Sequence, residues 1–264
     1  MRTTVNGLEF TYRSHGTGPT LVLLHAFPLN MRMFEAQVAA LADHMHVVTI
    51  DFRGFGASQL TSGDFSLEEL ADDVHALMAK LGHAHFVLGG VSMGGYVALA
   101  YLRRHPETLR GLILANTRAG ADTEEARQRR FKAVSEITSM GTGGLAATFP
   151  QTALAPGSVE ARQDLVGQLH AWIAEANPMA VIGAQLAMAN RPDSTALLPG
   201  IALPTLVIAG EQDGVTPPEE ARRMAEAIPG ATIATIPGAG HLSNMEQPEA
   251  FNEAVRAFMA QFPD

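Results

Sequence analysis

One serine of the chain stands in a setting that suits a nucleophile. Ser92 lies in the segment Gly90-Val91-Ser92-Met93-Gly94, after an apolar run at residues 86–88 and before a helix expected at residues 93–104. A serine at a sharp turn between a strand and a helix projects its hydroxyl outward, towards a substrate. Such a turn is strained by roughly 1–3 kcal/mol and needs small neighbours, which the glycines supply. We therefore expect Ser92 to act as a nucleophile; the structural alternative is a glycine-rich turn with a helix-capping serine.

A serine is a poor nucleophile until a base removes its proton, so the chain needs a histidine held by a carboxylate. Ten histidines are present, and His241 has the best position, in a glycine-containing loop that follows the last expected strand. Asp213 is the best carboxylate because it follows the strand expected at residues 205–209. The order of the three residues, Ser, Asp, His, suits such a triad. The weaker candidates for the acid are Glu211, Asn116, which could only orient a partner, and Asp122.

Backbone amides at two positions could stabilise the oxyanion that forms when a serine attacks a carbonyl. Met93 follows Ser92 directly and begins a helix, where the helix dipole favours negative charge. Phe27 follows an early strand, and Pro28 disfavours helical geometry at the residue before it. An extended Phe27 could therefore direct its N–H into the site, whereas the alternative is a plain loop in which Pro28 ends the strand.

Strands and helices alternate along most of the chain, which predicts an α/β fold with a mostly parallel sheet covered by helices on both faces. Residues 3–13 predict an antiparallel edge, and further strands are expected at residues 20–24, 47–51, 86–90, 112–115, 205–209 and 232–236. The accompanying helices are expected at residues 33–42, 67–81, 93–104, 218–227 and 249–262. The candidate site residues then lie at the carboxyl edge of the sheet, where ligands bind in such folds.

The alternation stops after about residue 118, and helices are expected at residues 124–140, 159–176 and 179–189. We expect residues 1–117 and 190–264 to form the core, and residues 118–189 to form an inserted helical cap over the carboxyl edge. Apolar cap residues could line a pocket for an uncharged acyl or alkyl group, although such residues more often pack a core. These are Trp172, Phe131, Phe149, Met140, Met179 and Met188.

Arginines near the start of this insertion suggest a different substrate. Arg118, Arg129 and Arg130 could attract an acidic group, although a solvated helix face is the more common use of the last two.

Composition limits the other classes of function. The net charge of −9 argues against a nucleic-acid partner, which needs clustered lysine and arginine. The absence of cysteine excludes disulfides, thiolate metal sites and cysteine nucleophiles. His44 and His46, and likewise His83 and His85, are spaced by two, but neither pair has an evident third ligand, so no metal is expected.

The sequence also shows no signal peptide and no run of about 18 apolar residues, which predicts a cytoplasmic protein without a membrane partner. Acyl transfer through a serine requires no cofactor, and the sequence leaves the oligomeric state open.

Four motifs in order resemble those of the α/β-hydrolase superfamily over nearly the whole chain. They are residues 25–28, 51–58 and 90–94, and the pair Asp213 and His241. The resemblance implies Ser92 as nucleophile, His241 as base and Asp213 as its orienter, with Phe27 and Met93 as oxyanion donors. Residues 51–58 match a turn that is usually structural. Residues 115–119 are similar to small esterases and 3-oxoadipate enol-lactonase-like hydrolases. Ala26 replaces the usual glycine of the first motif, which narrows the backbone conformations of the oxyanion loop.

These observations predict a serine hydrolase that cleaves a small carboxylic ester or lactone through an acyl-enzyme. The same triad could instead hydrolyse a carbon–carbon bond, carry out perhydrolysis or transfer an acyl group to an acceptor. A third alternative is a ligand receptor or regulatory protein that retains slow hydrolase activity.

Overall fold

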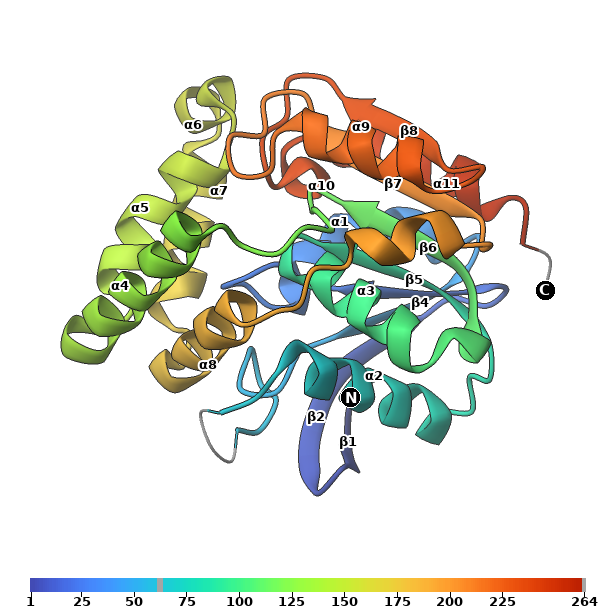
Figure 1. The fold of residues 1–264 in the computed structure, drawn as a ribbon, viewed down its shortest axis with the longest axis horizontal. Coiled ribbons are helices and arrows are strands. Elements are labelled where there is room, and N and C mark those ends of the chain that lie inside the picture. Colours follow the sequence, from blue (N-terminus) through green and yellow to red (C-terminus); the bar gives the residue numbers. More distant parts are fainter. Residues whose placement is uncertain (61–63, 263–264) are drawn as a thin grey trace.

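The computed structural model describes residues 1–60 and 64–262, and within them eight strands form one sheet in the order β1-β2-β4-β3-β5-β6-β7-β8 (Figure 1). The strands are β1 (Arg2–Val5), β2 (Leu8–His15), β3 (Thr20–Leu24), β4 (His46–Ile50), β5 (Phe86–Val91), β6 (Leu109–Ala115), β7 (Thr205–Gly210) and β8 (Thr232–Ile236). In this order, every neighbouring pair of strands from β4 to β8 is parallel. At the other edge, β1 pairs with β2 and β2 pairs with β4, both antiparallel. The mostly parallel sheet expected from the sequence is confirmed.

Helices cover both faces of the sheet, as the apolar character of its strands requires. The helices of the core are α1 (Glu35–Leu41), α2 (Leu67–Lys80), α3 (Met93–Arg104), α9 (Pro218–Ala227), the short α10 (Ser243–Glu246) and α11 (Pro248–Met259). Along β3, Val22 and Leu24 join an apolar cluster with residues of α2, α3 and α9. The alternate residues Leu21 and Leu23 join a second cluster with α1 and α11. Alternate residues of the same strand therefore pack into two different cores, one on each face of the sheet.

Two residues of the local sequence fix the start of α2. Ser66 caps α2, because its hydroxyl accepts the Glu69 amide and the Glu69 carboxylate accepts the Ser66 amide. This reciprocal capping satisfies amides that have no partner inside the helix. In the described part of the chain, the core also contains the 3₁₀ turns η1 (Met31–Phe34), η2 (Pro106–Thr108) and η3 (Thr195–Gly200).

Helices α4 to α8 lie together at one end of the sheet, at the left of Figure 1. They are α4 (Glu124–Met140), α5 (Gly143–Ala153), α6 (Pro156–Ala161), α7 (Gln163–Ala174) and α8 (Pro178–Ala189). Helix α4 packs against α8 and α5 packs against α7. The sequence predicts one helix over residues 159–176, but Arg162 has φ −114° and ψ 58° and separates α6 from α7. We propose that this group is the cap expected at residues 118–189.

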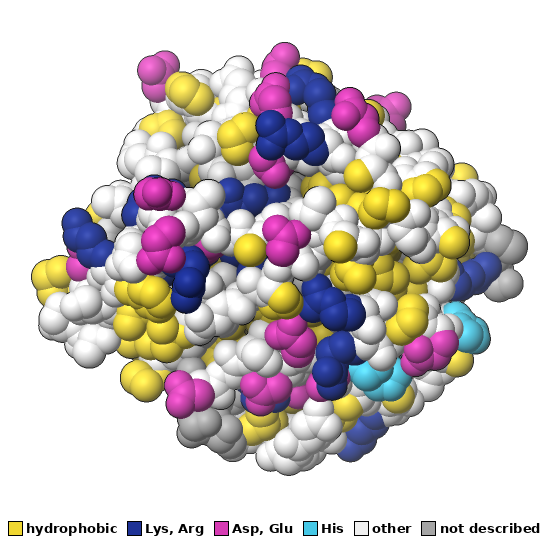
Figure 2. Space-filling view, viewed as in Figure 1, with side chains coloured by type: hydrophobic (Ala, Val, Ile, Leu, Met, Phe, Trp, Pro, Cys, Tyr) yellow, Lys and Arg dark blue, Asp and Glu magenta, His cyan; other side chains and the backbone are white. Residues whose placement is uncertain are grey.

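The surface carries both signs of charge. Figure 2 shows acidic and basic side chains interspersed over one face of the molecule. Among the described residues, none of the helices combines the length and the apolar character that crossing a membrane requires.

Candidate active site

Ser92 occupies a strained turn between β5 and α3. Its φ of 54° lies in the left-handed region that side chains other than glycine rarely adopt. Neighbouring backbone allows no side chain at two flanking positions. A Cβ on Gly90 would lie 2.1 Å from the carbonyl oxygen of Gly94, and one on Gly94 would lie 2.1 Å from that of Leu24. The glycines therefore let helix α3 start directly against the sheet, which leaves Ser92 at the carboxyl end of a central strand.

His241 joins Ser92 to Asp213. Its Nε2 lies 2.8 Å from Ser92 Oγ, and its Nδ1 lies 2.9 Å from Asp213 Oδ2. All three residues are buried, with exposed fractions of 8% for Ser92, 1% for His241 and 3% for Asp213. The structure thus brings together three side chains that are far apart in the sequence. Their spacing is that of a nucleophile, a base and an orienting carboxylate.

The helical group contacts the loop that carries His241. The His241 amide donates to the carbonyl oxygen of Ala153, the last residue of α5, at 2.6 Å. A Cβ on Gly240 would lie 2.4 Å from the Ala155 amide nitrogen, so only glycine fits beside this segment. The position of the imidazole therefore depends on packing between the core and α5.

Asp213 is held as a carboxylate by converging donors. Its Oδ1 accepts the amides of Val215 and Thr216, both at 2.8 Å. Its Oδ2 accepts the Thr216 hydroxyl at 2.7 Å and the Asn116 side-chain amide at 2.9 Å. Burial alone would raise the pKa of Asp213, but the charge of His241 and hydrogen bonds from His241, Asn116 and Thr216 outweigh it and lower that pKa to about 2. The carboxylate is therefore ionised throughout the neutral range.

Asn116 links the acid to the histidine loop. It follows β6, is 2% exposed and has a φ of 46°. Its Nδ2 donates to Asp213 Oδ2 and to the carbonyl oxygen of Gly240, at 2.9 and 3.2 Å. Its Oδ1 accepts the Ser243 hydroxyl, which fixes the orientation of the amide. Sequence reasoning identified Asn116 only as a weak rival for the acid and missed Thr216 and Ser243; the position of Asn116 directly after a strand was the available signal.

The two candidate oxyanion donors lie at the expected edge of the sheet. Met93 is the first residue of α3, so its amide has no carbonyl of that helix to bind. Phe27 is 8% exposed in the loop after β3. His25 anchors this loop, because its Nε2 accepts the Phe52 amide at 3.1 Å and its Nδ1 bonds the Ala26 carbonyl oxygen. Burial lowers the pKa of His25 to about 4, so its ring is neutral and serves this structural link.

The candidate pocket residues divide into buried and exposed groups. Trp172 and Met188 are buried, Phe131 and Phe149 are half-buried, but Met140 and Met179 are 72% and 52% exposed. The last two were expected to line a pocket, but their side chains lie largely in solvent in this structure. Their place in the apolar pattern did not reveal that they lie near the ends of α4 and α8, at the surface.

Trp172 also borders a cavity of about 380 Å³ beside the loop that carries Phe27. Pro28 and Leu29 are among its lining residues, and the Arg32 guanidinium lies 4.8 Å from the centre of the Trp172 ring. The lining does not include Ser92, Asp213 or His241, so this cavity borders the loop that carries Phe27 and is separate from the triad.

The rival acids have other partners. Glu211 is exposed and accepts the Gly238 amide at 2.9 Å. The Asp122 carboxylate is fully buried and binds the guanidinium groups of Arg118, Arg130 and Arg191. Arg118 and Arg130 are thus paired with Asp122 rather than directed at a substrate, while Arg129 is exposed.

The histidines that lie close together in the fold are not the pairs that are close in the sequence. The rings of His46 and His83 lie 4.8 Å apart, whereas His44 and His85 are exposed. His46 Nε2 bonds the Ser14 hydroxyl at 2.6 Å, and His83 Nδ1 bonds that of Thr20 at 3.2 Å. His46 begins β4 and His83 lies in the segment between α2 and β5, so the fold, rather than spacing along the chain, decides which histidines meet.

Comparisons with known proteins agree with this architecture. The family model described as alpha/beta hydrolase fold matches residues 19–248. The chain is 32% identical over 261 residues to 3-oxoadipate enol-lactonase 2 of Acinetobacter baylyi, covering 98% of this chain and 96% of that protein. A thermophilic esterase of Thermogutta terrifontis, solved with malate bound, superposes with a TM-score of 0.94 at 39% identity, covering 98% and 96% of the two chains. The enol-lactonase of Burkholderia xenovorans gives 0.92 at 29%, covering 98% and 100%.

Proposed function

The chain belongs to the α/β-hydrolase fold family, and from this premise we propose that it is a serine hydrolase that cleaves a small carboxylic ester or lactone through an acyl-enzyme. One observation carries the proposal. A continuous hydrogen-bonded chain runs from the hydroxyl of Ser92 through both ring nitrogens of His241 to the carboxylate of Asp213. This arrangement supplies a nucleophile, a general base and a group that fixes the tautomer of the base.

The first half of the reaction forms the acyl-enzyme. His241 Nε2 takes the proton of Ser92 Oγ as this oxygen attacks the ester carbonyl. The negative charge that develops on the carbonyl oxygen is stabilised by the amides of Met93 and Phe27. His241 then gives its proton to the leaving alkoxide, which departs as an alcohol, or stays tethered when the substrate is a lactone. Asp213 remains ionised and stabilises the imidazolium that forms.

The second half releases the acid. A water molecule gives its proton to His241 and attacks the acyl carbonyl, and the same two amides stabilise the second oxyanion. His241 returns the proton to Ser92, so the enzyme regains its starting state. All acid–base steps use this chain's own residues.

The substrate class is supported by relatives as well as by the triad. The similar proteins described above include an esterase and enol-lactonases, whose names state an ester or lactone as substrate. Apolar surface of the proposed cap would take the acyl or alkyl part; Phe149 is half-buried there, whereas Trp172 borders the neighbouring cavity that does not include Ser92.

Short p-nitrophenyl esters and a set of lactones of increasing ring substitution test the proposal. Ser92→Ala should reduce turnover to near the uncatalysed rate, since the nucleophile is lost. Ser139→Ala is a matched control, because Ser139 is exposed and bonds only helix backbone. Undiminished hydrolysis by Ser92→Ala would reject the nucleophile assignment. If product forms only when peroxide or an acceptor alcohol is added, and none forms with water alone, the activity is perhydrolysis or acyl transfer and not hydrolysis.

A further inference from the structure

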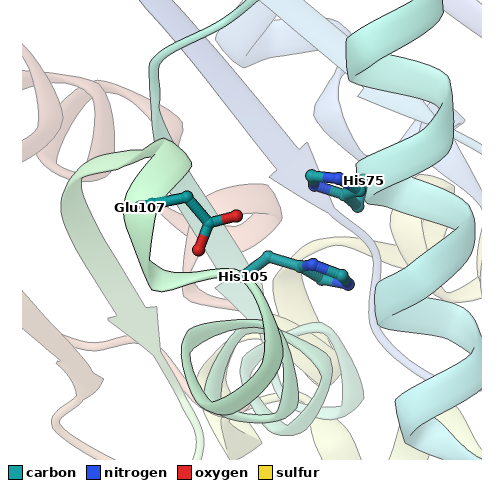
Figure 3. A group of neighbouring side chains, drawn as sticks. All are labelled: His75, His105 and Glu107. Atoms are coloured by element: carbon teal, nitrogen blue, oxygen red, sulfur yellow. The ribbon is translucent and has the colours of Figure 1, made fainter.

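A second group of ligand-type side chains lies outside the triad, where α2 meets the end of α3. His75 belongs to α2, His105 directly follows α3, and Glu107 belongs to the 3₁₀ turn η2. One ligand atom from each of these residues lies within 4.8 Å of the other two. Figure 3 shows the Glu107 carboxylate facing the two imidazole rings. Residues from three separate segments thus converge at one point.

Hydrogen bonds leave each histidine with one ring nitrogen for a ligand. His105 Nε2 bonds Asp72 Oδ1 at 2.8 Å, and His75 Nδ1 bonds the Tyr101 hydroxyl at 3.1 Å. No hydrogen bond to the other ring nitrogen of either histidine occurs among the described residues. Metal-bound histidines show the same pattern, in which a carboxylate or another polar partner holds the second nitrogen and orients the ring.

The charges around the pair favour a cation. The two rings stack with centres 3.9 Å apart and planes within 6°. Two carboxylates, Asp72 and Glu107, face the rings, and Arg104 pairs with Asp72.

The distances between the three ligand atoms are close to those that a tetrahedral metal ion requires. Three atoms no more than 4.8 Å apart all lie within about 2.8 Å of a common point, whereas zinc binds nitrogen and oxygen at about 2.1 Å. The distances alone therefore require each ligand atom to move by less than about 1 Å, but the nitrogen lone pairs of two stacked rings lie in parallel planes, so both rings must also rotate until these planes meet at the ion. The stacked rings must tilt towards each other to do so, and the broad torsion about the Cβ–Cγ bond of histidine allows this. Glu107 is exposed and both histidines are half-buried, so an ion can enter and keep a water ligand.

We propose that His75, His105 and Glu107 bind one divalent transition-metal ion, with Zn²⁺ the best match to two imidazoles and one carboxylate. Imidazole nitrogen suits Zn²⁺, Cu²⁺ and Ni²⁺, whereas Mg²⁺ and Ca²⁺ prefer oxygen ligands alone. The bound ion ties α2 to the corner between α3 and η2, two segments that Asp72 and Arg104 already link. The site acts on the folded state of the core and takes no part in the chemistry at Ser92.

Zn²⁺ titration of the full chain, stripped of metals and followed by calorimetry at pH 7.5, tests the proposal. We expect one Zn²⁺ per chain and a rise of the thermal unfolding midpoint with Zn²⁺ concentration, since the ion binds the folded state. His105→Gln should abolish this binding, and Glu107→Gln should weaken it at least about tenfold. Asp72→Asn should weaken it by about 10–100-fold, because Asp72 orients a ligand without touching the ion. MgCl₂ at the same concentrations should bind none of these proteins.

The controls are His44→Gln and His85→Gln, which remove exposed histidines outside the group. Both should bind Zn²⁺ as the unaltered chain does. Glu107 is exposed, so its variant tests the site even if a histidine variant fails to fold; histidine-ring NMR of the unaltered chain provides a further check. Zn²⁺ should shift the ring signals of His75 and His105 first. Absence of binding, or binding that is unchanged in the His105 and Glu107 variants, would overturn the proposal. A first shift at His46 or His83 would overturn it as well.

Discussion

Replacement of Asp213 by asparagine removes one charge from the centre of the proposed triad and leaves the shape of the side chain. The carboxylate accepts hydrogen bonds from Val215, Thr216, Asn116 and His241, and every one of these partners is a donor. An asparagine NH₂ cannot accept from them, so whichever way the amide is turned, one side of it faces donors. If its oxygen faces the two backbone amides, its NH₂ faces His241 Nδ1 and favours the tautomer that carries the proton on Nε2.

That tautomer cannot accept the proton of Ser92, because Nε2 is already protonated. The same substitution in the serine-protease triad lowers turnover by about 10⁴, which corresponds to roughly 5 kcal/mol of transition-state stabilisation. We expect a loss of this size in kcat for Asp213→Asn, with a smaller change in KM, since the substrate does not touch Asp213.

The assay is hydrolysis of a p-nitrophenyl ester by Asp213→Asn, with Glu211→Gln as the matched control. Glu211 is two residues away and also loses one charge, but it is exposed and bonds only the Gly238 amide. The control should retain turnover within a few-fold. A large loss in Glu211→Gln together with normal turnover in Asp213→Asn would refute the assignment of the acid.

The low pKa of Asp213 gives the same variant a signature in stability. The folded-state pKa of about 2 lies below the ordinary value of about 3.9, so the carboxylate stabilises the fold above pH 3.9, and this contribution is lost as pH falls through 2. The difference in unfolding free energy between the unaltered chain and Asp213→Asn should therefore shrink by on the order of 2 kcal/mol between pH 5 and pH 2. Urea unfolding at both pH values measures it, and a difference independent of pH would contradict the proposed pairing.

Further substitutions test the surroundings of the site. Asn116→Gly keeps the backbone conformation but removes the amide that orients the acid, so kcat should fall about 10–100-fold and the acidic limb of the pH–rate profile should shift; an unchanged profile would make Asn116 merely structural. Gly94→Ala should abolish folding or activity, because its Cβ would meet the Leu24 carbonyl oxygen. The control is Gly144→Ala, whose Cβ meets nothing within 4 Å; its circular dichroism spectrum and its turnover should equal those of the unaltered chain. Asp122→Asn should lower the free energy of unfolding by about 3–5 kcal/mol, since the three arginines around it lose a buried counter-charge; a change under about 1 kcal/mol in urea unfolding would argue against that cluster.

Most of the sheet could be predicted from the sequence, because each strand is a short apolar run between turn residues. The alternation of Leu21 and Val22 between two cores shows why such a run must be covered on both faces. The break at Arg162 could not be predicted, since residues 159–176 keep a helical apolar pattern on both sides of it. In the structure α7 packs against both α5 and α6, and this tertiary arrangement is not visible in the sequence pattern.

The candidate triad could be predicted because each member follows a strand whose carboxyl end is fixed by the sheet. The hydrogen bonds that hold the triad side chains in place could not be predicted in the same way. Thr216 and Ser243 contribute through hydrogen bonds that depend on how separate loops pack. The exposure of Met140 and Met179 could not be predicted either, since an apolar residue near a helix end can lie in solvent at little cost. His105 and Glu107 were not singled out at all, because their partner His75 is thirty residues away.

Covalent labelling of Ser92 tests the central claim most directly. The unaltered chain is incubated with a fluorophosphonate, and intact-protein mass spectrometry follows the adduct while the ester assay follows activity. We predict one phosphonate per chain, located on Ser92 by peptide mapping and accumulating in step with the loss of hydrolysis; Ser92→Ala should remain unlabelled, and His241→Ala should label far more slowly. An adduct on another residue that tracks the loss of activity, with Ser92 unmodified, would contradict the proposed mechanism.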